Sequence, residues 1–121
     1  MKIVPGSERE FLLDLMIQLS EFGVDPLIPR ESKDFFLKAI EGFDGSKEDC
    51  INYIVKKVPE WFTGVKGLPD WIQNPEWQFS EGKPMLYVGQ LEASMPGHQD
   101  SVFFLFWNPD NGEFKVVHQM Y

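Results

Sequence analysis

The chain has 121 residues, of which 43% are hydrophobic and 15% are aromatic, and its formal net charge is −8. This length and composition predict one ordered domain, residues 1–121, that buries a core of its own. The excess of 19 acidic over 11 basic residues argues against a protein that binds nucleic acid or an anionic membrane surface.

Residues 1–58 are expected to form the helical half of the domain. The first helix of this half is predicted to begin at Ser7. Ser7 and Glu10 have the spacing of a capping box, and apolar residues then recur at helical spacing up to Gly23. Glycine readily adopts the left-handed backbone conformation that ends many α-helices, so we expect this helix to end at Gly23. Phe11, Leu13 and Ile17 widen the apolar surface beyond one stripe, so we expect this helix to be covered on two sides.

Two further helices are expected before residue 59. One should run from near Ser32 to Gly42, and the next should start at Ser46, which again stands three residues before an acid. Pro59 should end that helix, because proline has no N–H to donate. Cys50 is the one cysteine, which excludes an intramolecular disulfide, and we expect it to be a small buried apolar residue.

Residues 59–84 have no regular period and carry four prolines and three glycines. A long segment without regular structure is uncommon in a compact domain unless it has a function. Because this segment also contains three tryptophans, Trp61, Trp71 and Trp77, we expect it to be packed and ordered.

Residues 85–121 have the pattern of strands, expected at 85–91, 102–107 and 114–121 with a hairpin turn at 108–112. The middle strand is apolar on both faces, so it should be central and covered by the helices. In the last strand, Phe114, Val116 and Met120 should share one face, and Val117 and Tyr121 the other. The predicted fold is α+β, with N-terminal helices packed on a C-terminal antiparallel β-meander.

Two glutamines stand within apolar runs, and a buried amide must find hydrogen-bond partners. We expect Gln90 to bond the loop backbone around Trp71 and so to hold the loop against the sheet. The alternative is that Gln73 and Gln90 line a small-molecule pocket with Trp71 and Tyr87 as its floor.

Four short runs carry a resemblance: GLPDWIQ (67–73), KPMLYVGQL (83–91), FFLF (103–106) and HQMY (118–121). Over residues 67–121 the chain resembles the YwqG-like family of bacterial proteins. That family has no settled biochemical function, so the resemblance implies a relationship and no activity. Many relatives have a cysteine pair before the KPM strand that looks like a metal site. Residues 78–82 contain no cysteine, so we expect no metal here.

No catalytic signature is present, which favours a non-enzymatic protein and leaves no catalytic residue or cofactor to assign. His98 and Asp100 would need a nucleophile such as Ser94 or Ser101 to form a catalytic group, and a solvated loop is the simpler interpretation. His118 is expected to be a hydrogen-bonded residue of a strand.

The favoured function is a protein-binding module in the cytoplasm, since no signal segment and no long apolar run is present. Within that class we expect an acidic immunity-type protein that neutralises a basic toxin, because opposite charge speeds association. The tryptophans of residues 59–84 would anchor the partner inside a charged rim. The alternative is the small-molecule-binding domain. A monomer or a homodimer is expected, the latter through the edge strand 114–121. The expected binding residues are Trp61, Asp70, Trp71, Gln73, Glu76, Trp77, Tyr87 and Gln90.

Overall fold

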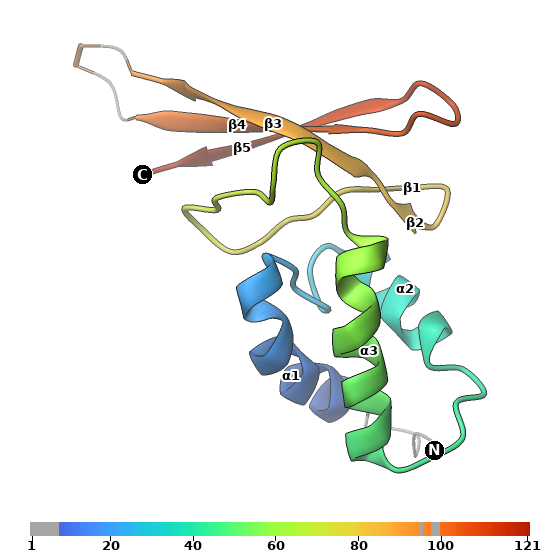
Figure 1. Cartoon of the computed structure of the whole chain (residues 1–121). Helices are drawn as coiled ribbons and strands as arrows, with labels where there is room; N and C mark the ends of the chain where they lie inside the picture. The colour runs from blue at the N-terminus through green and yellow to red at the C-terminus, as the bar shows by residue number, and fades with distance from the viewer. Residues whose placement is uncertain (1–7, 95, 98–99) are drawn as a thin grey trace.

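The computed structural model of the chain describes residues 8–94, 96–97 and 100–121. Helices come first and an antiparallel sheet follows, which confirms the predicted α+β class (Figure 1). The helices are α1 (Glu8–Leu19), a short 3₁₀ turn η1 (Ser20–Phe22), α2 (Arg30–Ala39) and α3 (Lys47–Trp61). Within the described residues, no helix combines the length and the apolar character needed to cross a membrane.

The helix ends follow local chemistry. Gly23 has φ 71° and ends the first helical stretch as predicted. The capping box at Ser46 is also confirmed, because its hydroxyl accepts a hydrogen bond from the Asp49 amide at 3.0 Å and the Asp49 carboxylate accepts one from the Ser46 amide. The expected cap at Ser7 lies outside the described residues.

Helix α2 was expected from near Ser32 to Gly42 and runs from Arg30 to Ala39, with the buried Ser32 hydroxyl donating to the carbonyl of Asp25 at 2.6 Å. Two other expectations for the helices were wrong. Helix α3 continues past Pro59 to Trp61, since a proline in the last turn removes only one hydrogen bond near the end. Helix α1 is not covered on two sides, because Ile17 is 70% exposed.

The sheet has three antiparallel strands in the order β3 (Leu86–Ala93), β4 (Ser101–Trp107) and β5 (Phe114–Met120). Strand β4 is central, as predicted, with Phe104 opposite Gln90 on one side and opposite Val117 on the other. A β-bulge interrupts β3 between Tyr87 and Gly89. Two short strands, β1 (Phe79–Ser80) and β2 (Lys83–Pro84), form a separate hairpin.

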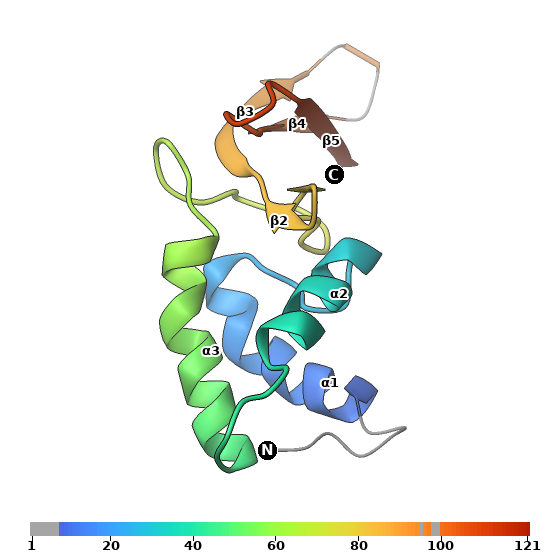
Figure 2. The same cartoon turned by 90° about the vertical axis from the view of Figure 1, so that its right-hand side faces the viewer.

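Residues 62–78, called the linking segment below, lie between the helices and the sheet (Figures 1 and 2). Its rings connect the two halves. Phe62 stacks on Phe36 of α2 at 5.7 Å between ring centroids, and Trp77 lies 5.2 Å from Phe62. Trp77 in turn lies 5.4 Å from Phe106 of β4. All four rings are buried, so one continuous core runs from helices to sheet through the linking segment.

Strand β4 is covered on one face only, contrary to expectation. Phe104 and Phe106 point inward and are fully buried, whereas Phe103, Leu105 and Trp107 point outward and are half-buried. The helices, the linking segment and the β1–β2 hairpin all lie on the same side of the sheet (Figure 1). Among the described residues, nothing lies over the opposite side.

Candidate functional site

The tryptophans expected to bind a partner are held mostly inward. Trp77 is 0% exposed, and its indole N–H donates to the carbonyl of Met85 at 2.9 Å, so it cannot touch a partner in this conformation. Trp71 is half-buried, donates from its indole to the Gly23 carbonyl at 2.8 Å and lies 4.4 Å from the Phe104 ring. Trp61 is half-buried at the end of α3, away from the sheet.

Gln90 has the structural role that we expected from the sequence. Its Oε1 accepts a hydrogen bond from the Asp70 amide at 3.0 Å and another from the Tyr87 hydroxyl at 2.9 Å. The Tyr87 ring is buried, and this burial, together with the charge of Asp70, raises the pKa of the Tyr87 hydroxyl. These contacts tie the loop before Trp71 to strand β3.

A second glutamine, Gln119, has a larger role that we did not predict. It is 1% exposed, and its Oε1 accepts hydrogen bonds from the amides of Ile72 at 3.1 Å and Gln73 at 3.0 Å. Its Nε2 donates to the Asn74 carbonyl at 2.8 Å and to the Glu76 carboxylate at 3.2 Å. The sequence contained a signal for this role, because Gln119 stands two residues after Val117 on the same strand and therefore faces inward like Val117.

The remaining expected residues also serve to hold the linking segment. The side chain of Gln73 is exposed, and its Nε2 donates to the Met120 carbonyl at 2.9 Å, while Glu76 accepts from Gln119. The expected site therefore separates into three places: Asp70, Tyr87 and Gln90 at β3; Gln73 and Glu76 at β5; and Trp61 beside α2. Apart from Trp61, these residues hold the linking segment onto the inner side of the sheet, and together they do not form one recognition surface.

The opposite side of the sheet has the features of an interaction surface. Register and alternation place twelve residues on this outer face, and none of them is Asp, Glu, Lys or Arg. Leu91, Phe114 and Val116 are 64%, 60% and 59% exposed. The outer face comprises Leu86, Gly89, Leu91 and Ala93 of β3, Ser101, Phe103, Leu105 and Trp107 of β4, and Phe114, Val116, His118 and Met120 of β5.

The rings on the outer face support one another across the strands. Phe103 stacks on His118 with ring centroids 4.6 Å apart and planes 10° apart. Trp107 stacks on Phe114 at 5.9 Å and 17°. Such pairs hold aromatic side chains in fixed positions, which lowers the entropy lost when a partner covers them.

Acidic residues lie at the two ends of the outer face. Within residues 85–121 the acids are Glu92, Asp100, Asp110 and Glu113, all exposed, and Lys115 is the one lysine or arginine. Asp100 directly precedes β4, and Asp110 and Glu113 lie in the turn between β4 and β5, whereas Glu92 lies opposite Val102 and so belongs to the inner side. Slight desolvation and the nearby charges of Glu92, Asp70 and Asp100 raise the pKa of the Tyr121 hydroxyl. Lys115 donates to the carbonyl of Phe79 at 2.6 Å on the inner side, so it does not offset the acids at the rim.

Comparison of the chain with family models, curated proteins and solved structures gives no match. Within residues 8–94, 96–97 and 100–121, no three His, Cys, Asp or Glu side chains gather where they could hold a metal ion. His98 lies outside the described residues, and Asp100 accepts a hydrogen bond from Ser94 at 2.7 Å. His118 lies on β5 within the outer face, as a strand residue.

Proposed function

We propose that this protein is a protein-binding module that docks a basic partner through the outer face of the β3–β4–β5 sheet. The observation that carries the proposal is an uncovered sheet face without Asp, Glu, Lys or Arg, with exposed carboxylates at both of its ends. A buried aromatic centre inside a charged rim is the usual arrangement of energetically important interface residues.

The size of the outer face supports an interface. Three strands of seven or eight residues present a footprint of roughly 14 Å by 23 Å, or about 330 Å², at the usual strand spacing and rise. Apolar patches of this size on soluble proteins are often functional. A stable complex buries about 800 Å² on each partner, so contacts must extend beyond the apolar centre onto the acidic rim.

The acidic residues at the rim of the outer face favour a partner with a positively charged surface. A second copy of this chain, docked face to face, would bring one acidic rim against the other, whereas a basic protein would complement it. The net charge of −8 adds long-range attraction for the same partner. An immunity-type protein that neutralises a basic toxin is the narrower proposal within this class, and this charge is its support. A cytoplasmic location belongs to the same proposal and is consistent with the free, buried Cys50.

The alternative expected from the sequence, a ligand pocket between Trp71 and the sheet, has no support from the geometry. The ring of Trp71 lies 4.4 Å from Phe104 and fills that space. The resemblance to the YwqG-like family stays a prediction about relationship, and we propose no reaction.

The test is a comparison of two lysine substitutions of exposed valine or isoleucine residues. Val116→Lys places a charge within the outer face, and Ile17→Lys places the same charge on the exposed side of α1. Wild type and both variants are used to capture proteins from a lysate of the source cells. Each captured protein is then purified, and its affinity for the three baits is measured by calorimetry at two salt concentrations.

We expect a basic protein to bind wild type and Ile17→Lys equally, and Val116→Lys about a hundredfold more weakly, because a lysine would be buried unpaired. Binding should weaken at high salt. A partner that is acidic, or one that binds Val116→Lys normally, would refute the proposal. If the wild-type protein forms a dimer and Val116→Lys dissociates it, the outer face binds a second copy of this chain and not a basic partner. For the narrower proposal, co-expression with the product of an adjacent toxin gene should protect cells, and Val116→Lys should abolish protection.

A further inference from the structure

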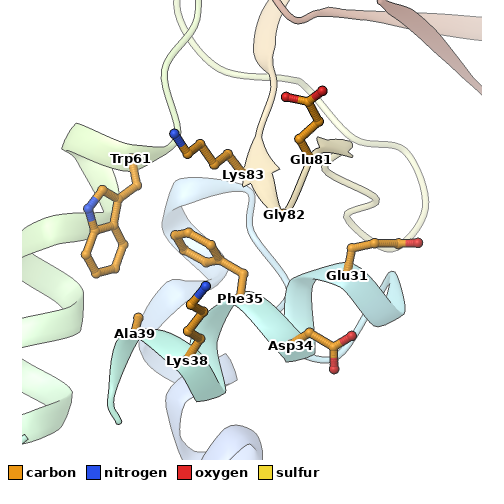
Figure 3. Close-up of a pocket in the computed structure, with 9 residues that line it drawn as sticks. All are labelled: Glu31, Asp34, Phe35, Lys38, Ala39, Trp61, Glu81, Gly82 and Lys83. Carbon is orange, nitrogen blue, oxygen red and sulfur yellow. The ribbon is translucent and has the colours of Figure 1, made fainter. Parts of the chain in front are cut away.

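A pocket remote from the outer face lies between α2, the end of α3 and the β1–β2 hairpin (Figure 3). Its volume is about 470 Å³, within the range of sites that hold small molecules. The residues that carry the argument are Glu31, Asp34, Phe35, Lys38, Trp61 and Lys83.

Two fixed rings form the apolar wall of this pocket. Phe35 and Trp61 meet edge to face, with ring centroids 5.4 Å apart, and both are half-buried. Phe35 also packs edge to face against Phe36 at 5.4 Å and Phe62 at 5.7 Å, so the core behind the pocket holds its ring in place. A wall that exists before the ligand arrives suits a flat aromatic group, because little ordering remains to be done on binding.

Two ammonium groups stand beside this wall without an ion-pair partner. The salt bridges among the described residues join Lys47 with Asp14 and Lys57 with Glu60, and include neither Lys38 nor Lys83. Figure 3 shows both free ammonium groups on the same side of the pocket as the two rings. They come from different elements, α2 and β2, and so could hold an anion from two directions.

Two of the three acids that line the pocket, Glu31 and Asp34, lie at its other end, and the third, Glu81, lies at the turn of the β1–β2 hairpin with its carboxylate directed away from the two rings (Figure 3). Figure 3 shows the carboxylates of Glu31 and Asp34 directed away from the rings. An anionic ligand is therefore repelled from that end and attracted to the end that holds the rings and the lysines. A cationic aromatic ligand that packs its ring on the same wall would bring its positive charge near the two ammonium groups, which is unfavourable.

We propose that this pocket binds a small planar aromatic carboxylate. Its ring packs against Phe35 and Trp61, and its carboxylate lies between Lys38 and Lys83. Because the pocket joins the helical half to the β1–β2 hairpin, such a ligand also stabilises the fold, in proportion to its occupancy. This proposal does not depend on the one made for the outer face, and an experiment that refutes either of them leaves the other unchanged.

The test is an NMR titration of the full ¹⁵N-labelled chain with three matched probes that share one ring system. Indole-3-acetate is the anion, indole-3-acetamide is its neutral counterpart and tryptamine is the cation. We expect indole-3-acetate to shift the Ala39 and Gly82 amides and the Trp61 indole N–H, and to bind about fivefold to tenfold more tightly than the neutral amide.

Substitutions separate charge from shape. The double variant Lys38→Gln with Lys83→Gln should lose the preference for the anion while it still binds the neutral amide. Lys33→Gln with Lys56→Gln removes the same charge from exposed positions outside the pocket and should keep the preference.

Three results would overturn the proposal. The first is no shift at these three positions with about 5 mM indole-3-acetate, since an affinity weaker than that is not specific recognition. The second is binding of tryptamine as tight as that of indole-3-acetate. The third is a set of shifts confined to β3, β4 and β5, which would place the probe on the outer face.

Discussion

Replacing Gln119 with leucine tests whether this one amide holds the linking segment against the sheet. The substitution keeps a side chain of similar size on the inward face of β5 but removes one acceptor and one donor group. Four contacts are lost: those from the amides of Ile72 and Gln73, and those to the Asn74 carbonyl and the Glu76 carboxylate.

The expected loss of stability follows from the exposure of those partners. Each of the three backbone contacts contributes about 1 kcal/mol, and the half-buried Ile72 amide costs a further ~1–2 kcal/mol when it is left without an acceptor. Burial of the leucine side chain offsets about 1 kcal/mol of this. The free energy of unfolding of Gln119→Leu should therefore fall by about 3–4 kcal/mol, a large part of the stability of an ordinary domain.

Urea denaturation followed by tryptophan fluorescence measures this loss. Amide hydrogen exchange supplies a local readout, because exchange at Ile72 and Gln73 should speed up more than in the rest of the chain. The neighbouring substitution Met120→Leu is the control, since the Met120 side chain faces outward, is 42% exposed and is replaced by one of similar volume, so it should change stability by less than about 0.5 kcal/mol. A loss below about 1 kcal/mol in Gln119→Leu, or unchanged exchange at both amides, would refute the reasoning.

Other substitutions test other parts of the fold. Gly64→Ala should lower the free energy of unfolding by about 2–3 kcal/mol, measured by chemical denaturation, because the added Cβ would lie 1.8 Å from the Gly67 carbonyl oxygen. Gly82→Ala should lower it by about 1 kcal/mol, because Gly82 has a positive φ but nothing lies within 4 Å of its added Cβ. Equal losses in the two variants would contradict this explanation. Cys50 is fully buried and should react with a thiol reagent only in denaturant, so fast labelling of the native protein would show that the packing is wrong. Burial raises the pKa of the Cys50 thiol above its ordinary value of 9.0. The unfolded state thus loses this proton first, and stability should decline as pH rises above 9, less so in Cys50→Ala; an identical decline in both proteins would exclude Cys50 as a cause.

Local chemistry made several features readable from the sequence. Gly23 and Ser46 have conformations that depend on residues within one turn of the chain, and both were predicted correctly. The role of Gln90 was predicted from a simple requirement, because an amide within an apolar strand must find a hydrogen-bond partner.

Features that depend on residues far apart in the chain could not be predicted from the sequence. The exposed face of β5 carries Phe114, Val116 and Met120, whereas the inward face carries Lys115 and Gln119, which is the reverse of ordinary alternation. The polar residues point inward because their partners, Phe79 and residues 72–76, lie far away in the chain. For the same reason the sequence could not tell whether Trp77 is a core residue or an interface residue.

The position of the linking segment between helices and sheet has a consequence for folding. Neither half can complete its apolar core alone, because Phe36 of α2 and Phe106 of β4 meet only through Phe62 and Trp77. A fragment that ends at residue 61 would leave Phe36 without its stacking partner. The chain should therefore unfold in a single cooperative transition, and its folding rate should be limited by closing contacts between residues far apart in sequence.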